Sequence, residues 1–380
     1  MLVRDFDFDL PPELIAQTPA EPRDAARLLR LQRTNSATSH HVFRDLPALL
    51  RADDLLVFND TRVLRARLRG YKIGTDGLPG ARVEALLLRE RERNVWETLL
   101  KPSARLRSGT PLVFVSPDGA QKVEATPLER QKDSWIVRFS PPQNRDVREM
   151  LGQLGEVPLP PYIQSRASSE ADYQTVYARD ATQWRGEQSS TRCAENSTLE
   201  SSAAPTAGLH FTPQLMENLR ARGIESCFVT LGIGIGTFRP MQSENVENHV
   251  MHREEFEVSD EAARKINAQK ARGGRVVAVG TTSVRVLESA AEQNESQVAT
   301  VRAGSASTEI FIRPGHGFRV VDALVTNFHL PKSTLLVMIS AFAQSGTESG
   351  DGLAKVRAAY EEAVRERYRF FSFGDAMLID

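Results

Sequence analysis

Hydrophobic and polar positions follow one pattern near the two ends of the chain and another in the middle. Toward the ends, apolar strands alternate with helical segments. Strands are predicted at Ala26–Leu31 and Leu55–Phe58, and helices near Phe43–Leu50 and at Pro213–Arg222, where Thr212 supplies the N-cap. Later segments repeat strand, polar turn and helix. This alternation predicts an α/β fold with a mainly parallel sheet covered by helices.

The middle of the chain, from about residue 64 to 139, consists of short β-rich runs separated by turn signals. Such runs predict a small antiparallel sheet or barrel, inserted into the main domain. We therefore predict a main domain made of residues 1–63 and 158–380, and an inserted β-barrel domain at 64–157. Residues 179–202 are rich in Ser, Thr, Gln and Glu without an apolar period, so they are predicted to form a loop that is disordered or covers the site.

Composition narrows the classes of protein that the chain can belong to. Its 380 residues carry 48 Lys and Arg against 49 Asp and Glu, so a polyanion would have to bind a local patch. Cys193 and Cys227 lack the spacing of a disulfide framework or a zinc site. The acidic start is unlike a signal peptide, and the longest apolar run, Leu335–Ala343, is shorter than the roughly 20 residues that span a bilayer. We expect a cytoplasmic protein without a membrane partner.

Candidate chemistry lies in polar turns at predicted strand ends. In a parallel sheet these turns converge on one edge, where ligands bind. Their hydroxyl, amide, carboxylate, guanidinium and imidazole groups suit a polar small molecule. The turns are Asn59–Arg62, Pro205–Phe211, Gly232–Phe238, Gly280–Thr282 with the nearby Arg285, and Thr326–His329.

Several of these motifs allow more than one interpretation. Thr281 and Thr282 are expected to cap a helix whose free N–H groups either hold a carboxylate or phosphate or are simply capped. The glycines after residue 231 do not fit a dinucleotide fingerprint. His249 and His252 lack a third ligand, so no metal is expected.

An arginine stripe begins the inserted domain. Arg65, Arg67 and Arg69 would share one face of a strand, because alternate side chains of a strand point the same way. The stripe either contacts phosphates or protects a solvated edge strand, and the sequence leaves both interpretations open.

Nine ordered blocks carry a more specific signal over residues 5–379. They are EPRDAARLL, LLVFNDTRVLRARL, PLPPYI, YQTVYA, APTAGLHFT, GTFRP, VGTTSVRVLES, VTNFHLPKSTLL and RYRFFSFGDAMLI. Together they closely resemble the S-adenosylmethionine:tRNA ribosyltransferase-isomerases, a family of queuosine-biosynthesis enzymes. The resemblance implies an α/β main domain built from both chain ends and an inserted six-stranded β-barrel.

The resemblance also implies an activity. The ribosyl moiety of S-adenosylmethionine would be transferred and isomerised onto 7-aminomethyl-7-deazaguanine at the tRNA wobble position, giving epoxyqueuosine-tRNA, adenine and methionine. The expected partners are S-adenosylmethionine, as a co-substrate, and that tRNA. No other cofactor and no metal are expected, and the chain is expected to act as a monomer.

Such chemistry needs proton transfer, because a sulfonium acidifies the C5′ hydrogens and departing adenine must be protonated. Our hypothesis is that His210 or His329 is the acid or base, with Asp60 as a second candidate. Arg65, Arg67 and Arg69 are the candidates for binding tRNA. The candidates for binding substrate are Asn59, Thr61, Arg62, Thr206, Gly208, Phe211, Gly236, Thr237, Gly280, Thr281, Thr282, Arg285 and Asn327.

The sequence departs from the family pattern in two places. A longer segment replaces the usual short connection between Tyr177 and Ala203, and Gly232 stands where the family commonly has His. We expect activity to survive, since the other blocks are intact. The main rival is a non-catalytic tRNA-binding module of the same fold. A nicotinamide-dependent oxidoreductase would fit the strand–helix alternation but lacks its glycine fingerprint.

Overall fold

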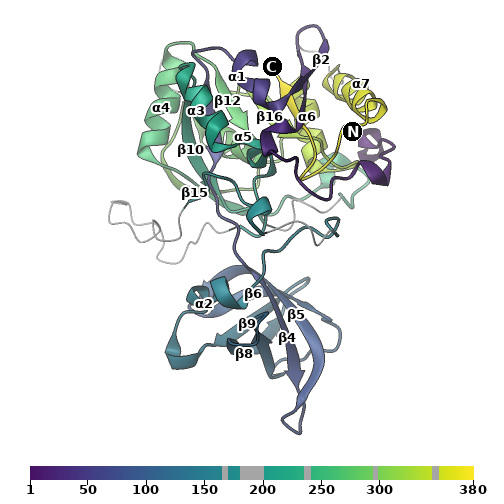
Figure 1. Cartoon of the computed structure of the whole chain (residues 1–380), viewed down its shortest axis with the longest axis vertical. Helices are drawn as coiled ribbons and strands as arrows, with labels where there is room; N and C mark the ends of the chain where they lie inside the picture. The colour runs from purple at the N-terminus through teal and green to yellow at the C-terminus, as the bar shows by residue number, and fades with distance from the viewer. Residues whose placement is uncertain (165–169, 180–200, 235–240, 294–297, 345–350) are drawn as a thin grey trace. The chain divides into compact units, whose positions relative to one another are not determined.

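The computed structural model describes residues 1–164, 170–179, 201–234, 241–293, 298–344 and 351–380 (Figure 1). Its contacts divide the chain into two compact units. The first contains Met1–Arg62, Pro160–Thr191 and Ala204–Asp380, and the second contains Val63–Leu159 and Arg192–Ala203. Each unit has a hydrophobic core of its own.

The first unit is built on a nine-stranded sheet in the order β15-β11-β10-β3-β12-β16-β17-β1-β2. The strands are β1 (Arg27–Leu31), β2 (Thr38–Val42), β3 (Leu55–Asn59), β10 (Glu225–Leu231), β11 (Glu254–Val258), β12 (Val276–Val279), β15 (Gly304–Thr308), β16 (Ala323–Asn327) and β17 (Ala376–Ile379). A separate pair consists of β13 (Ala291–Gln293) and β14 (Ala299–Val301).

The direction of pairing differs between the centre and the edges of this sheet. Strands β10, β3, β12 and β16 run parallel, whereas β11, β15 and β2 pair antiparallel with their neighbours. At the other end of the centre, β17 is antiparallel to β16 and parallel to β1. The sheet is therefore mixed, and the expected parallel arrangement holds only for its centre. A short turn joins β1 to β2, and such a turn allows only an antiparallel hairpin.

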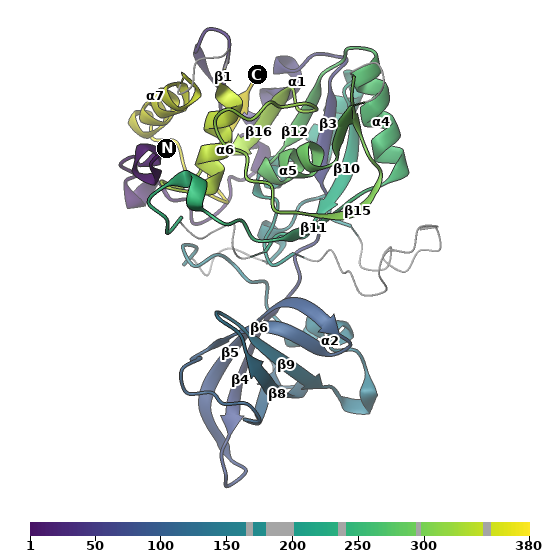
Figure 2. The same ribbon diagram turned by 180° about the vertical axis from the view of Figure 1, so that it is seen from behind.

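Mainly apolar sequence explains the central strands, although β3 ends in Asn59 and β16 ends in Thr326 and Asn327. Every residue of β3, β12 and β16 is buried, as expected of parallel strands that are covered on both faces. Figures 1 and 2 view the sheet from opposite sides: α1 (Leu46–Leu49) and α3 (Pro213–Ala221) lie in front in one, and α5 (Thr281–Ser289) and α6 (Thr334–Ala343) in the other. Two further helices, α4 (Asp260–Ala271) and α7 (Asp351–Arg365), complete this set.

Helix starts agree with the sequence in one case and not in another. Thr212 caps α3 by accepting a hydrogen bond from the Leu215 N–H at 3.1 Å, as predicted. The predicted hydroxyl caps of α5 are wrong. Gly280, with a φ of 86°, occupies the N-cap position without a side-chain bond, so Thr281 and Thr282 already belong to the helix.

The second unit contains a closed six-stranded antiparallel barrel, which confirms the predicted barrel. Its strands, in the order β4-β5-β6-β9-β8-β7, are β4 (Arg67–Ile73), β5 (Pro79–Glu92), β6 (Val95–Lys101), β7 (Leu112–Val115), β8 (Lys122–Arg130) and β9 (Trp135–Ser140). The core takes Leu68, Trp96 and Phe114 from the strands and Leu151 from α2 (Val147–Leu154). At Gly70 a Cβ would lie 2.1 Å from the Val113 carbonyl oxygen, so only glycine fits there.

Short 3₁₀ helices connect these elements and place several loops of the first unit. They are Val3–Phe6, Pro12–Leu14, Arg23–Ala25, Phe43–Asp45, Glu170–Tyr173, Thr206–His210 and Val246–Asn248, with Pro142–Asn144 in the second unit.

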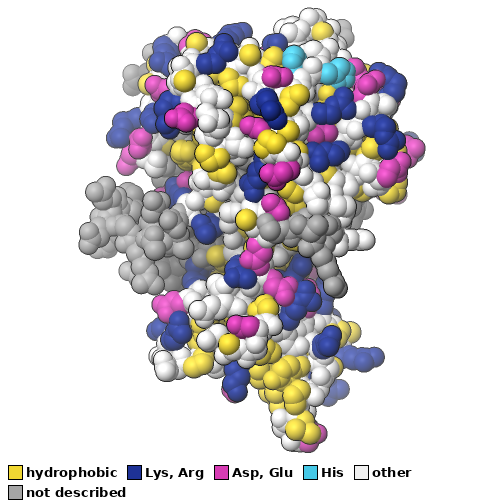
Figure 3. All heavy atoms as spheres, in the orientation of Figure 1, with side chains coloured by type: hydrophobic (Ala, Val, Ile, Leu, Met, Phe, Trp, Pro, Cys, Tyr) yellow, Lys and Arg dark blue, Asp and Glu magenta, His cyan; other side chains and the backbone are white. Residues whose placement is uncertain are grey.

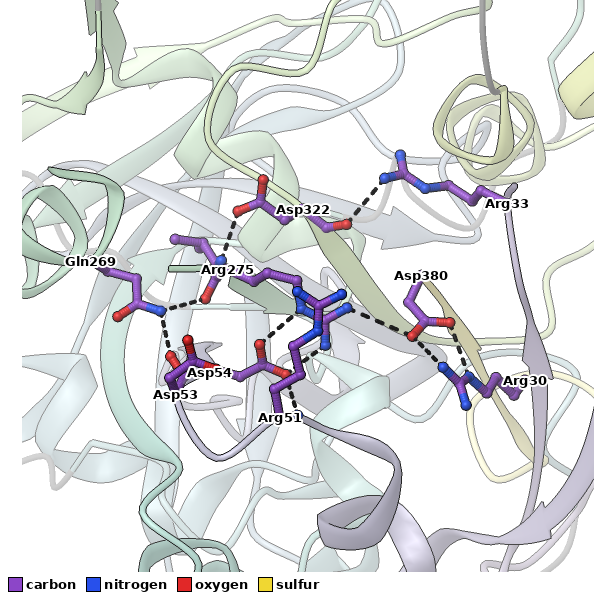
Figure 4. A network of polar contacts seen from close by, with 10 residues as sticks. Arg30, Arg33, Arg51, Asp53, Asp54, Gln269, Arg275, Asp322 and Asp380 are labelled. Carbon is purple, nitrogen blue, oxygen red and sulfur yellow. Dashed lines mark hydrogen bonds and ion pairs between the residues drawn. The ribbon is translucent and has the colours of Figure 1, made fainter. Parts of the chain in front are cut away.

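Ion pairs fill the amino-end edge of the central strands (Figure 4). Arg275, just before β12, holds Asp54, just before β3, through two hydrogen bonds of 2.9 and 2.7 Å. Arg30 holds Asp380 in the same bidentate way, at 3.0 and 2.8 Å. These groups satisfy one another, so this edge of the sheet is a structural clamp.

Candidate functional site

A cavity lies at the opposite edge, where central strands of the first unit end. Three polar segments meet there: residues 204–207, the Gly280–Thr282 turn after β12, and the end of β16 with His329. Three of the five turns predicted from the sequence therefore contribute to one cavity. Ile233 also lines it and belongs to a fourth predicted turn, Gly232–Phe238. The lining consists of Ala204, Pro205, Thr206, Ala207, Ile233, Gly280, Thr281, Thr282, Thr326, Asn327, His329 and Leu335.

His329 is the imidazole of this cavity. Its Nε2 lies 2.9 Å from the Thr326 hydroxyl, and its backbone N–H donates to the Tyr360 hydroxyl at 2.8 Å. Burial lowers the pKa of His329 to about 3, so the ring is neutral at physiological pH. A neutral imidazole can accept a proton, whereas an imidazolium at this place would be a strong acid.

Two other lining residues have polar atoms that are buried without a hydrogen-bond partner among the described residues. They are the Thr282 hydroxyl and the Asn327 Oδ1. The Asn327 amide is nevertheless fixed, because its Nδ2 donates to the Phe371 carbonyl at 2.9 Å. An unsatisfied buried polar group costs about 1–3 kcal/mol. These two atoms are therefore candidates to bind a polar ligand.

His210 lies close to this cavity but does not line it. Its ring stacks on Phe43 at 4.8 Å, and its Nε2 lies 3.3 Å from Nδ2 of Asn327. Burial, followed by the charges of Arg369 and Arg23, lowers the pKa of His210 to about 3. The structure therefore gives the two candidate histidines different positions: His329 faces the cavity, and His210 packs behind Asn327.

Asp60 and Asn59, at the end of β3, bind other parts of the protein. Asp60 accepts hydrogen bonds from Thr230 at 2.7 Å and from Nε of Arg179 at 2.6 Å. Burial raises the pKa of Asp60 although the Arg179 charge opposes this. The Asn59 side chain bonds both backbone groups of Leu231, at 3.3 and 3.1 Å. These contacts tie β3 to β10, and neither residue lines the cavity.

Comparison with known proteins identifies the family. The family model described as queuosine biosynthesis protein matches residues 3–379. The chain belongs to this family. The resemblance of the nine sequence blocks is thereby confirmed.

Curated relatives match this chain over its full length. Proteins named S-adenosylmethionine:tRNA ribosyltransferase-isomerase are 47% identical in Moorella thermoacetica, over 380 residues, and 48% identical in Symbiobacterium thermophilum, over 379 residues; each match covers all of both chains. A crystal structure of S-adenosylmethionine tRNA ribosyltransferase from Thermotoga maritima has 36% identity and a TM-score of 0.52, covering 99% of this chain and 100% of the other.

Other residues that the sequence predicts to bind substrate do not line the cavity, and several of them lie in packed surroundings. Phe211 belongs to the aromatic core, edge-to-face with Phe43 at 5.1 Å. A Cβ at Gly208 would lie 1.9 Å from the Tyr177 hydroxyl, so this glycine permits close packing. Thr61 is buried beside Asn59, and Arg62 is exposed and donates to the Arg179 carbonyl. Gly236 and Thr237 lie outside the described residues, as does most of the predicted loop at 179–202.

The candidate arginines lie in three settings. Arg285, on α5, forms a buried ion pair with Glu254 and lines a second cavity. In the barrel unit, Arg65 donates to the Gly152 carbonyl and Arg67 to that of Leu159. Arg69 pairs with Glu156 but keeps 63% of its side chain exposed, so it is the most accessible of the stripe.

Sequence reasoning missed the roles of Thr326 and Glu254 in this family member. The sequence places Thr326 in a polar turn and assigns it no role, although its hydroxyl lies three residues before His329 and contacts that ring. The pairing of Glu254 with Arg285 could not be inferred from the local sequence, because the two residues are 31 positions apart. Among the described residues, no cluster of His, Cys, Asp and Glu could hold a metal ion, and no helix is long and apolar enough to span a membrane.

Proposed function

We propose that the chain is an S-adenosylmethionine:tRNA ribosyltransferase-isomerase. It transfers and isomerises the ribosyl moiety of S-adenosylmethionine onto 7-aminomethyl-7-deazaguanine at the tRNA wobble position, and the products are epoxyqueuosine-tRNA, adenine and methionine. Family membership and full-length relatives of that name support this proposal. The structural observation that carries it is the cavity that combines a neutral imidazole with hydroxyl and amide oxygen atoms that have no hydrogen-bond partner among the described residues.

The cavity suits the nucleoside part of S-adenosylmethionine. Thr282 and Asn327 supply the unpartnered hydroxyl and carbonyl oxygen, which would bind ribose hydroxyls and fix the sugar. The backbone N–H groups at the start of α5 add donors, because the first turn of a helix leaves them unpaired. Thr206 and Thr281 extend the polar lining.

His329 would move the proton that the chemistry requires. The sulfonium acidifies the C5′ hydrogens, and the neutral imidazole takes one of them, leaving an ylide. Burial makes the resulting imidazolium a strong acid, which would return the proton to a ring nitrogen of departing adenine. The aminomethyl nitrogen of the tRNA then bonds to the sugar carbon that adenine leaves and gives a proton to His329, which is neutral again and passes that proton to solvent. Closure of the epoxide breaks the carbon–sulfur bond, and the bonding pair leaves with methionine as a neutral thioether.

Positioning of the imidazole would fall to its neighbours. The Thr326 hydroxyl at Nε2 sets the tilt of the ring, and the Tyr360 hydroxyl fixes the backbone of His329. His210 would act indirectly, through its contact with Asn327. Asp60 would hold the strand end through Thr230 and Arg179.

The tRNA would bind a charged face of the barrel. Arg69, Arg82 and Lys101 are exposed and line one hollow together with Tyr71. On the face shown in Figure 3, Lys and Arg side chains are interspersed with Asp and Glu, which fits a local contact rather than a basic coat. Replacing all three cations by Gln should weaken tRNA binding. It should also make the slope of log affinity against log salt concentration shallower, by the amount that up to about three phosphate contacts contribute. An unchanged salt dependence would exclude this face.

Single-turnover adenine release tests the activity and the base together. Purified protein is mixed with S-adenosylmethionine and tRNA that carries the aminomethyl precursor. Release should depend on that tRNA, and His329→Gln should slow it by roughly 100-fold or more. His41→Gln, at a half-buried histidine on β2, is the control. Binding of both substrates without adenine release would instead indicate a non-catalytic tRNA-binding module.

Two further points complete the proposal. We propose the cytoplasm as the site of action, because the substrate is a tRNA, and the monomer as the active form. Co-localisation with the tRNA pool and light scattering of the active sample would test them.

A further inference from the structure

A second cavity of the first unit adjoins the proposed nucleoside site. Its polar lining consists of His249, His252, Glu254, Arg285 and Thr334. The remainder is apolar and comes from Met251, from residues 310–312, and from Leu335 and Met338 of α6. Leu335 lines both cavities, so the two are neighbours.

Arg285 is the unusual group in this cavity. Its side chain is 4% exposed, and Nη1 pairs with Glu254. Nε and Nη2 are buried and have no hydrogen-bond partner among the described residues. These two nitrogens present parallel N–H groups along one edge of the planar guanidinium, the geometry that binds a carboxylate with two hydrogen bonds.

Two other arginines show how this chain uses the same edge. Arg30 binds both oxygens of Asp380 through Nε and Nη2, and Arg275 binds both oxygens of Asp54 in the same way (Figure 4). Within the part of the chain that the structure describes, Arg285 alone of these three leaves the edge unfilled. A buried guanidinium edge without a partner is costly, so the geometry calls for a planar oxyanion.

Arg285 favours an anionic group of the ligand, whereas the neighbouring carboxylate of Glu254 favours a cationic group. One of its oxygens accepts from Arg285 and the other from the Gly234 N–H at 2.9 Å. Each carboxylate oxygen has more than one acceptor position, so Glu254 can also accept from a cation. A carboxylate beside an ammonium is the signature of an α-amino acid. The apolar side chains of Ile310, Ile312 and Met338 suit an aliphatic chain.

We propose that this second cavity binds the α-amino acid end of the methionyl chain of S-adenosylmethionine, with its carboxylate on the Nε–Nη2 edge of Arg285 and its ammonium at Glu254. The proposal rests on the function proposed above. Thr281 and Arg285 are four residues apart on α5 and therefore share one face of that helix. A single ligand can thus place its nucleoside at Thr281 and its amino acid end at Arg285.

Ligands that differ only at the amino acid end test the proposal on the unaltered protein. Isothermal titration compares S-adenosylmethionine with decarboxylated S-adenosylmethionine, which lacks the carboxylate, and with 5′-methylthioadenosine, which lacks the whole amino acid. Loss of the carboxylate should weaken binding by about 10- to 100-fold, as expected for a desolvated charge-assisted pair. Equal affinity for the first two ligands would overturn the proposal.

Substitution of Arg285 gives the complementary test. Arg285→Gln should lose the same factor toward S-adenosylmethionine, bind 5′-methylthioadenosine as before, and no longer discriminate against the decarboxylated ligand. Arg302→Gln, at an exposed ion pair with Glu292, is the matched control. Arg285→Gln leaves Glu254 without its cation and can therefore prevent folding. If the variant does not fold, the titrations of the unaltered protein with the three ligands decide the question.

The two proposals fail in different ways. If the protein binds S-adenosylmethionine with carboxylate discrimination but releases no adenine in the presence of tRNA, the proposed reaction is wrong and the amino acid site stands. If adenine is released while the carboxylate adds no affinity, the reaction stands and the assignment of the second cavity is wrong.

Discussion

Two buried imidazoles should make the first unit sensitive to mild acid. Burial lowers the pKa of both His210 and His329 to about 3, from an ordinary value of 6.5. Between these values the unfolded chain binds a proton at each site and the folded protein does not. Their contribution to stability is therefore fully present above about pH 6.5 and is lost as the pH falls toward 3.

The size of the effect follows from the two pKa values. Each pH unit below 6.5 removes about 1.4 kcal/mol per imidazole from the free energy of unfolding. At about pH 5 the loss is roughly 2 kcal/mol for each histidine and roughly 4 kcal/mol for both. Asp60 acts in the opposite direction, because burial raises its pKa in the folded protein and protonation in acid relieves that cost.

Urea unfolding followed by circular dichroism, at about pH 7 and about pH 5, measures this loss. His210→Gln and His329→Gln should each reduce the difference between the two pH values by roughly 2 kcal/mol, because a variant has one imidazole fewer to protonate. Comparing each variant with the parent cancels the contribution of Asp60 and of all other shared groups. The reasoning is refuted if His210→Gln and His329→Gln keep the full difference of the parent.

Three further substitutions test separate parts of the structure. Thr282→Val removes a buried hydroxyl that has no partner in the described part of the chain, so it should raise the free energy of unfolding, measured by thermal unfolding, by about 1 kcal/mol. The same change should weaken S-adenosylmethionine binding about tenfold, and a variant that is both less stable and fully active would contradict this. Glu288→Ala removes the acceptor of three backbone N–H groups, at 319–321, and should cost about 2–4 kcal/mol in urea unfolding. Asp54→Asn should destabilise the amino-end edge by about 3 kcal/mol with little effect on adenine release from the folded fraction.

The central strands and the barrel were predictable because local sequence determines them. β3 begins with an uninterrupted apolar run, Leu55–Phe58, and the barrel strands alternate between buried and outward positions, as Leu68 and Arg69 illustrate. The directions of the edge strands were not predictable. The pairing of β17 is decided by neighbours from distant parts of the chain, β16 and β1, rather than by its own four residues.

The candidate site was predictable as a set of turns but not as a set of atoms. The rule that ligands bind at the carboxyl ends of parallel strands identified the turns that contain Thr282 and His329. His210 has a similar local sequence setting, yet tertiary packing turns its ring onto Phe43. Asp60 likewise looks free in the sequence, and its partner Arg179 is 119 residues away.

The two edges of the central sheet use similar residue types for opposite purposes. At the amino-end edge, the guanidinium edges of Arg30 and Arg275 are filled by carboxylates, which stabilises the fold without a ligand. Around the two cavities, polar atoms of Thr282, Asn327 and Arg285 have no partner among the described residues. Leaving them unpaired lowers the stability of the free protein, and a ligand that pairs them would return that free energy as binding. S-adenosylmethionine should therefore raise the melting temperature more than 5′-methylthioadenosine does at equal concentration, because only the former can also pair Arg285.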